Sequence, residues 1–259
     1  MTTSAPSSSG LAPRRPALTH RDAMALAATE YHRMAAVLAA LDDDAWGLPT
    51  DCPAWHVRQL ASHMVGMAAM VSNPVEGARQ QRLARAEQAT HGGAMVDALT
   101  ALQVRERADK APAEIVAEAR RVAPRAARGR RWTPSLVRRR TVPEPQLVNG
   151  VEEPWTFGYM LDVILTRDPW MHRIDLARAT GSDLELTAGH DGVIVDDVVR
   201  EWAGRHGRPY RLELTGPAGG TWSGGAEVPG LIRMDAVEFC RTVSGRAGGS
   251  GLLATEVPF

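Results

Sequence analysis

Apolar residues recur every three or four positions through much of the first 180 residues of the chain. Residues at this spacing share one face of a helix, so the pattern predicts helices that each bury one side. The expected helices cover residues 19–41, 54–72, 94–109, 113–123 and 155–180. The last of them ends before Gly181, a residue type that often follows a helix. We therefore expect the first part of the chain to be all-helical.

The pattern changes after Gly181, where alternation and turn residues replace helical spacing. Tyr210–Thr215 alternates between apolar and polar residues and predicts a strand, and the glycines and proline that follow predict a turn. Asp235 is suited to cap a short helix over residues 236–244. The other expected elements are a helix over 192–205, a strand within 227–234 and a last strand over 252–259.

The predicted fold class is therefore α+β with two domains. Residues 18–181 form a helical bundle, and residues 182–259 form a small α+β domain. Residues 1–17 are rich in Ser, Pro, Ala and Arg and are expected to be a disordered tail, because they have little apolar surface to bury.

An arginine-rich segment follows the helix expected over 113–123. Residues 120–140 carry nine arginines together with Pro124 and Pro134, and they favour an extended, solvated connection. Trp132 is the only aromatic residue among these arginines, which favours a solvated loop over an RNA-binding segment. Residues 141–154 are expected to be a loop with a short strand.

The composition of the 259-residue chain is that of an ordinary globular protein. Hydrophobic residues make up 44% and charged residues 23%, which excludes disorder of the whole chain. The 30 basic and 30 acidic residues balance, so no global field draws the protein to nucleic acid or to a membrane surface, and neither is expected as a partner. No apolar run is long enough to predict a membrane span.

The two cysteines, Cys52 and Cys240, are too few for a disulfide framework and indicate a reducing compartment. The amino-terminal segment MTTSAPSSSGLAPRRPALT lacks the apolar run of a signal peptide. A cytoplasmic location is therefore expected. Neither cysteine has an activating neighbour in the sequence, and both are interpreted as packing residues.

Three residues are candidates for metal chemistry. Asp168 and His172 lie four positions apart on one predicted helix, so their side chains share a face and can hold one metal ion. His63 lies on the apolar face of the helix over 54–72, and a third ligand from another helix would leave a fourth position open for water or a thiolate.

Each candidate has a structural alternative. A lone histidine on an apolar face, such as His63, is more often a core residue than a ligand. Because Pro169 follows Asp168, that carboxylate is also suited to cap a helix that restarts there. Asp175 lies on nearly the same face as His172, where it either orients the imidazole or is solvated.

Three stretches resemble a known family. Residues 46–66 read WGLPTDCPAWHVRQLASHMVG, residues 158–181 read GYMLDVILTRDPWMHRIDLARATG, and residues 235–259 read DAVEFCRTVSGRAGGSGLLATEVPF. Together they resemble the mycothiol-dependent maleylpyruvate isomerase family. The resemblance implies a DinB-like four-helix bundle that holds a metal, followed by a smaller α+β domain.

The resemblance also implies a site. His63, Asp168 and His172 match the family's metal ligands, with Asp168 standing where the family pattern has Glu. The implied metal is a divalent ion, with zinc expected, and mycothiol is the implied thiol cosubstrate. Arg246, in the Ser-Gly-Arg match, is implied to face the site from the small domain as a catalytic and cosubstrate-binding residue.

Two functions remain open from the sequence. The first is a metal-dependent enzyme, either an isomerase or a thiol transferase, whose partners are a small electrophile and a low-molecular-weight thiol. The second is a non-catalytic, metal-binding DinB-like protein with a role in stress or regulation. Metal content together with thiol-dependent turnover distinguishes the two.

Overall fold

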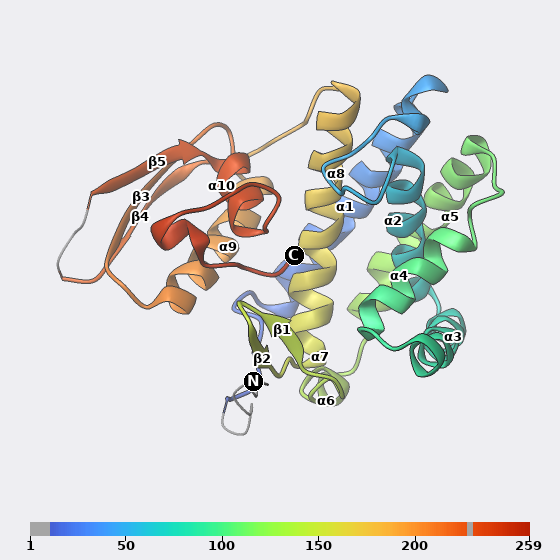
Figure 1. Ribbon diagram of the computed structural model, residues 1–259, viewed down its shortest axis with the longest axis horizontal. Coiled ribbons are helices and arrows are strands. Elements are labelled where there is room, and N and C mark those ends of the chain that lie inside the picture. Colours follow the sequence, from blue (N-terminus) through green and yellow to red (C-terminus); the bar gives the residue numbers. More distant parts are fainter. Residues whose placement is uncertain (1–10, 227–229) are drawn as a thin grey trace, which may run out of the picture. The chain divides into compact units, whose positions relative to one another are not determined.

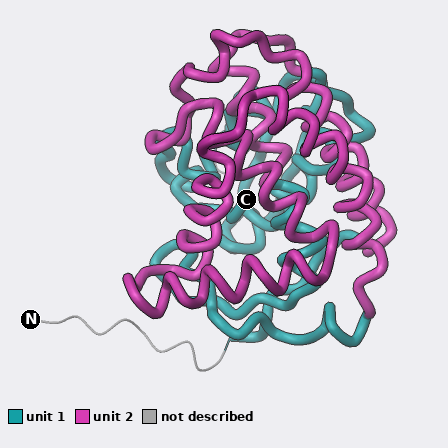
Figure 2. Tube along the Cα trace, turned by 90° about the vertical axis from the view of Figure 1, so that its right-hand side faces the viewer, with its two compact units in different colours: residues 1–19, 135–167, 185–259 teal, residues 20–134, 168–184 magenta. Residues whose placement is uncertain are grey.

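The structure is a computed structural model that describes residues 11–226 and 230–259. Its internal contacts divide the chain into two compact units, which are coloured separately in Figure 2. One unit, here the bundle unit, comprises residues 20–134 and 168–184. The other, here the sheet unit, comprises residues 135–167 and 185–259 together with the chain up to residue 19. The predicted α+β fold class, with a helical bundle in the first part and a small mixed domain later, is confirmed.

Four long helices form the bundle: α1 (His20–Ala40), α2 (Val57–Ser72), α5 (Pro112–Arg131) and α8 (Leu165–Thr180). Helix α5 packs against both α1 and α2 (Figure 1). Side chains of α8 in turn reach α1 and α2, since Arg173 binds Glu30 and Asp168 meets His63. The bundle interior is lined by apolar side chains of different sizes, among them Ala27, Met34, Leu60, Met64, Ile115, Ala119, Trp170 and Ile174.

Two further helices, α3 (Pro74–His91) and α4 (Met95–Arg105), pack against α2 and against each other. The sequence pattern did not predict α3. Its buried residues are Gly77, Gln80 and Ala84, so it has no apolar stripe from which a helix can be recognised. Asn73 begins this helix by accepting the Val75 N–H with its side chain, and Pro74 follows in the first turn.

The extended connection predicted for residues 120–140 is wrong for its first half. Helix α5 continues to Arg131 with Pro124 inside it, and a short helix, α6 (Ser135–Arg138), follows. Alanines at helical spacing account for the difference, because Ala119, Ala123 and Ala126 are all buried and pack as one face. Pro124 itself is exposed.

A short hairpin precedes α8 in the sheet unit. Strands β1 (Gln146–Val148) and β2 (Val151–Glu153) pair antiparallel. Asn149 and Gly150 connect them with φ of 52° and 74°, the two positive values that a tight hairpin turn requires. A single helical turn, α7 (Phe157–Tyr159), then leads into a π-helical segment, η2 (Met160–Ile164).

The interruption expected at Asp168-Pro169 is displaced by one turn. Pro169 lies inside α8, and the irregular backbone lies at Leu165, whose ψ is 4° and whose N–H reaches back to Met160. A proline ring clashes with the carbonyl four residues earlier, which here belongs to Leu165. The wider turn just before Pro169 removes that clash and lets the helix continue through Asp168 and His172.

The sheet unit contains a three-stranded sheet in the order β4-β3-β5. Strand β3 (Tyr210–Thr215) pairs antiparallel with β4 (Gly220–Gly224) and parallel with β5 (Leu231–Asp235). Helices α9 (Asp191–His206) and α10 (Ala236–Val243) pack on it (Figure 1). Asp235 caps α10 as predicted, accepting the N–H groups of Val237 and Glu238.

The small domain differs from the sequence-based expectation at three elements. Strand β4 was not predicted, since the expected turn over residues 216–220 reaches only its first residue. The last strand predicted for residues 252–259 is wrong, since a 3₁₀ turn, η3 (Gly251–Ala254), stands there and the Val257 N–H binds the Val243 carbonyl. The strand predicted within 227–234 starts at Leu231, and residues 227–229 lie outside the described residues.

The predicted tail meets the described chain at residue 11. Residues 1–10 of it lie outside the described residues. Arg14 is held in place: it forms an isolated bridge with Trp155, and its side chain binds Glu153 at 3.1 Å. The described part of the expected tail therefore belongs to the sheet unit.

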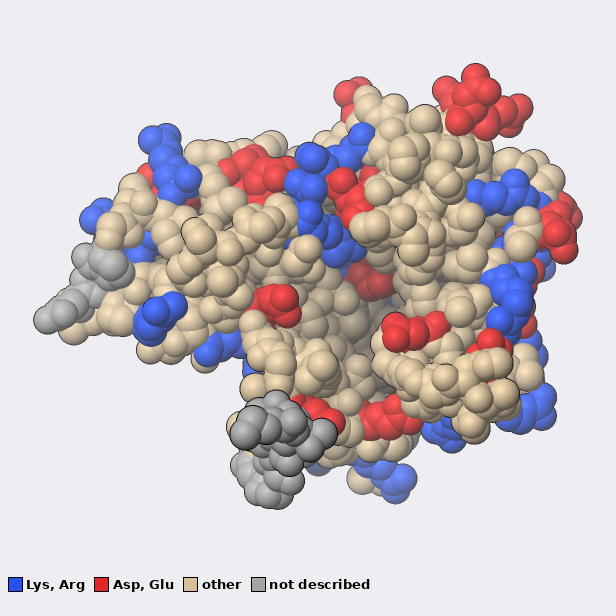
Figure 3. Space-filling model, viewed as in Figure 1, with Lys and Arg blue, Asp and Glu red and all other residues tan. Residues whose placement is uncertain are grey.

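Charged side chains of both signs alternate over the face shown in Figure 3, in keeping with the balanced count of 30 basic and 30 acidic residues. Among the described residues, no helix combines the length and the apolar character needed to cross a membrane.

Candidate metal centre

The three predicted metal ligands converge within the bundle unit. His63 comes from α2, and Asp168 and His172 come from successive turns of α8. Asp168 Oδ1 lies 3.3 Å from Nε2 of His63 and 3.3 Å from Nε2 of His172. The two imidazole rings stand nearly perpendicular, with their centroids 5.2 Å apart. Both histidines thus direct the same type of nitrogen at one carboxylate oxygen.

The other nitrogen of each ring also faces an acceptor. Nδ1 of His63 lies 3.0 Å from the side-chain oxygen of Gln103, and Nδ1 of His172 lies 2.9 Å from Asp175 Oδ2. A carboxylate accepts hydrogen bonds and donates none, so Nδ1 of His172 carries the hydrogen. This arrangement leaves Nε2 as the nitrogen whose lone pair is available, which is the form in which histidine binds metals.

The site is largely withdrawn from water. His63 and His172 are 5% and 6% exposed, and the Asp168 side chain is 17% exposed. Burial opposes charge on both Asp168 and His172, but their mutual attraction outweighs it. His172 and His63 hold the pKa of Asp168 far below its usual range, and Asp168 raises the pKa of His172 well above its usual value. The site therefore stabilises positive charge between these groups.

A divalent cation fits this donor set. Two imidazole nitrogens and one carboxylate oxygen are ligands of catalytic zinc sites, which leave a fourth position open. When neutral, the two Nε2 atoms are lone-pair donors that face a negatively charged oxygen, so the cluster needs either protons or a cation between its members. The chemistry of these three groups thus agrees with the sequence-based expectation of a metal site, and the helix-capping alternative for Asp168 does not describe its position within α8.

An indole ring covers part of this cluster. The Trp55 ring centroid lies 5.2 Å from that of His63 and 6.2 Å from that of His172. Trp55 belongs to the loop between the 3₁₀ turn η1 (Asp44–Gly47) and α2, where its carbonyl accepts hydrogen bonds from both the N–H and the hydroxyl of Thr50. The proline-rich loop thus places the Trp55 side chain beside the two histidines.

Cys52 lies in the same loop and closer to the site than its interpretation as a packing residue suggested. Its sulfur is 3.7 Å from Asp175 Oδ2, the oxygen that also accepts from His172. Cys52, His172 and Asp175 therefore form a second group of potential ligand atoms. Nδ1 of His172 is already committed to Asp175 in this group, which favours His63, Asp168 and His172 as the metal set.

Arg246, the fourth residue singled out from the sequence, belongs to the sheet unit. It follows α10 and is half-buried, and its guanidinium lies 3.4 Å from the Ser244 hydroxyl. Its backbone N–H binds the Arg241 carbonyl, which holds the turn after α10. Its predicted position facing the metal ligands stays a prediction.

The helical bundle and its histidine–carboxylate cluster define a candidate metal-binding protein, and sequence comparison assigns its family. Residues 27–177, more than half of the chain, match the mycothiol maleylpyruvate isomerase N-terminal domain. The chain belongs to this family. The matched segment contains His63, Asp168 and His172, while Arg246 lies beyond it.

Individual relatives agree with this assignment. Uncharacterized proteins from two strains of Mycobacterium tuberculosis are each 28% identical to the chain over 227 residues, covering 84% of this chain and 82% of theirs. Crystal structures of the mycothiol-dependent maleylpyruvate isomerase and of a histidine-to-alanine mutant of it share the fold. Each gives a TM-score of 0.55 and covers 93% of this chain and 95% of its own, at 17% and 16% identity.

Proposed function

We propose that this protein is a metal-dependent enzyme that uses a low-molecular-weight thiol to isomerise or S-conjugate a small electrophilic substrate. The observation that supports this function best is the convergence of two histidine Nε2 atoms on Asp168 Oδ1, 3.3 Å from each, while a second acceptor holds each Nδ1. Membership of the mycothiol maleylpyruvate isomerase family supports mycothiol as the thiol. In this proposal His63, Asp168 and His172 hold the ion, and zinc suits their donor set.

When bound, the ion would lower the pKa of a thiol at its open position, so that the nucleophilic thiolate is present at neutral pH. The residues of the chain supply the geometry. Gln103 and Asp175 fix the two imidazole rings from behind. Trp55 lies against one side of His63 and would exclude water there, which would strengthen electrostatic interactions at the site.

The thiolate sulfur would add to one carbon of an activated double bond, and the electron pair of that bond would move onto the substrate as an enolate. Rotation about the resulting single bond and departure of the same thiolate then give the other geometric isomer, so no atom is gained or lost. In S-conjugation a proton would reach the enolate carbon instead, and the carbon–sulfur bond would remain. Both outcomes need the same thiolate, so the donor set is common to an isomerase and a transferase.

The proposal is tested by metal content and turnover on the same sample. Protein purified without chelator should contain about one divalent ion per chain. It should isomerise maleylpyruvate, or add the thiol to an activated double bond faster than the reaction without protein, when mycothiol is present, with glutathione as the comparison thiol. A protein that holds the ion but shows no thiol-dependent turnover is the non-catalytic metal-binding protein instead, and a protein without the ion contradicts both functions.

Arg246 gives a prediction for the sheet unit. As the proposed partner of a substrate or cosubstrate carboxylate, its guanidinium offers two parallel hydrogen bonds that lysine cannot reproduce. Arg246→Lys should lower turnover by about 10- to 100-fold, the equivalent of a charged hydrogen bond, and leave the metal content unchanged. Arg211, exposed on β3, provides the control as Arg211→Lys. Full activity in both Arg246→Lys and Arg246→Ala would show that Arg246 is not part of the site.

A further inference from the structure

We propose that Gln103, Gln80 and Glu76 form a directed hydrogen-bond relay that positions the His63 imidazole and keeps its Nε2 free of hydrogen. The three are positioning residues, since only Gln103 touches His63. The consequence for metal affinity rests on the proposed function, whereas the effect on the His63 tautomer does not.

The relay runs through the bundle unit from α2 to α4 and α3. The side-chain oxygen of Gln103 lies 3.0 Å from Nδ1 of His63, and its amide nitrogen donates to the Gln80 oxygen at 3.0 Å. The Gln80 amide donates in turn to Glu76 Oε1 at 2.8 Å and to the Gly66 carbonyl at 3.2 Å. Gln80 and Gln103 are fully buried and His63 is nearly so. Burying an amide side chain costs free energy unless its oxygen and nitrogen both form hydrogen bonds, and the contacts of this network supply them.

The direction of the relay follows from its outer end. The Glu76 carboxylate and the Gly66 carbonyl can only accept, so the Gln80 amide nitrogen must face them. The Gln80 oxygen then faces Gln103 and requires the nitrogen of that amide, which also leaves a second hydrogen for the Met67 sulfur at 3.1 Å. The Gln103 oxygen is thereby directed at His63 and requires a hydrogen on Nδ1. The reverse orientation would place two acceptors, or two donors, against each other at several contacts.

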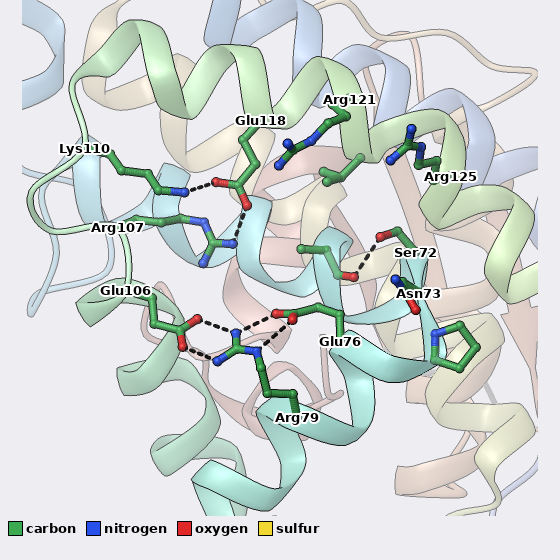
Figure 4. A pocket seen from close by; sticks show the side chains of 13 residues that line it. Ser72, Asn73, Glu76, Arg79, Glu106, Arg107, Lys110, Glu118, Arg121 and Arg125 are labelled. Carbon is green, nitrogen blue, oxygen red and sulfur yellow. Dashed lines mark hydrogen bonds and ion pairs between the residues drawn. The ribbon is translucent and has the colours of Figure 1, made fainter.

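Glu76 anchors the relay at a solvent-reachable cavity. Figure 4 shows the Arg79 guanidinium between two carboxylates, those of Glu76 and Glu106. Its hydrogen bonds to Glu76 lower the pKa of that carboxyl, although burial opposes them. The cavity at this point has a volume of about 630 Å³ and is lined by all three residues. The anchoring group is therefore a stable anion, which fixes the polarity of the buried amides behind it.

Gly66 is required for the relay to fit. It lies one turn after His63 on α2, and a Cβ there would stand 2.6 Å from both Cβ and Cγ of Gln103. The stem of Gln103 thus occupies the space of a missing side chain, and this brings its amide to His63. The same glycine supplies a carbonyl acceptor for Gln80.

The test reads the His63 tautomer in metal-free protein by nitrogen-15 NMR at alkaline pH, with His63→Ala used to assign the signals. Wild-type protein should show hydrogen on Nδ1. Gln103→Met removes the acceptor, so hydrogen should move to Nε2, where Asp168 can accept it. Gln103→Glu restores an acceptor and should restore the wild-type tautomer. Gln81→Met, at an exposed position of α3, is the matched control and should change nothing.

A second variant tests the outer end without altering the contact to His63. Glu76→Gln replaces one of the two acceptors of the Gln80 amide with a group of either polarity, while the Gly66 carbonyl remains, so the direction is held less firmly and some hydrogen should appear on Nε2. Zinc affinity, measured by competition with a chromophoric chelator, should fall about 10- to 100-fold in Gln103→Met and recover in Gln103→Glu. Glu76→Gln remains informative even if Gln103→Met does not fold.

The outcomes separate the relay from the proposed function. An unchanged tautomer in Gln103→Met and Glu76→Gln would overturn the relay, whether or not the protein binds zinc. A shifted tautomer in a protein that binds no zinc would uphold the relay and contradict the function. Loss of folded protein in Gln103→Met with a wild-type tautomer in Glu76→Gln would show that the amides serve stability alone, which also overturns the proposal.

Discussion

Replacing His172 with alanine should leave the protein essentially without metal. His172 supplies one of three proposed ligands, and the raised pKa of its imidazole shows how strongly this position attracts positive charge. Structural zinc sites bind their ion with a free energy of about 10–16 kcal/mol. Shared among three ligands, this is about 4 kcal/mol each, so the loss of His172 corresponds to a roughly 1,000-fold lower zinc affinity. Metal analysis after purification without chelator measures the effect, and thiol-dependent turnover should fall to background in the same sample.

The control for this variant is His32→Ala. His32 is an exposed histidine on α1 of the same compact unit, so its removal should leave metal content and turnover unchanged. Because His172 also binds the buried Asp175, thermal unfolding of the variant must be followed on the same sample. A folded His172→Ala protein that retains a full complement of metal would show that the ion, if one is bound, uses a different set of ligands.

The metal ligands could be predicted because their pattern is local in part. Asp168 and His172 share a helical face by spacing alone, and the apolar stripe places His63 on an inward face. Their convergence depends on which faces α2 and α8 turn toward each other, and the family resemblance supplied that information. Pro169 made Asp168 resemble a helix cap, and only the irregular backbone at Leu165 explains why the helix continues through it.

Gln103 could not have been found from the sequence. It lies 40 residues from His63 on another helix, and a glutamine in a helical segment has no pattern that marks it as buried. Its position depends on Gly66 and on the packing of α3, a helix whose buried face of Gly77, Gln80 and Ala84 is polar or small. The feature that hid α3 from hydrophobic periodicity is therefore the same one that builds the relay.

Errors in the fold prediction have a similar cause. Arginines and Pro124 indicated an exposed connection where α5 continues, because small alanines form its buried face and carry little hydrophobic signal. At the carboxyl end, the apolar residues of 252–259 suggested a strand, but the turn η3 and a backbone contact to Val243 hold them instead. Hydrophobic periodicity did not predict the secondary structure of elements that are buried by close backbone packing and not by a wide apolar stripe.

Replacing Glu201 with glutamine should greatly destabilise the sheet unit. The Glu201 carboxylate accepts hydrogen bonds from the Tyr159 hydroxyl at 2.6 Å and from the guanidinium groups of Arg167 and Arg205 at 2.8 and 2.7 Å. All of these side chains are buried. Removing one charge from such a cluster leaves its partners poorly compensated, so the free energy of unfolding should fall by about 3–5 kcal/mol. Urea denaturation at neutral pH measures this change.

The pH dependence of the same variant is a sharper test. Burial opposes the charge of Glu201, but Arg167 and Arg205 lower its pKa below the ordinary value of 4.5. A carboxyl group with a lowered pKa in the folded state stabilises the protein above that ordinary value and loses this contribution as the pH falls through its folded pKa. The difference in unfolding free energy between wild type and Glu201→Gln should therefore be full at pH 7 and shrink progressively below about pH 4.5.

Glu213→Gln is the matched control, since Glu213 pairs with Arg233 at 3.0 Å on the surface and should contribute less than about 1 kcal/mol at any pH. Equal effects of the two substitutions at neutral pH would mean that the buried cluster stabilises the fold no more than an exposed ion pair does.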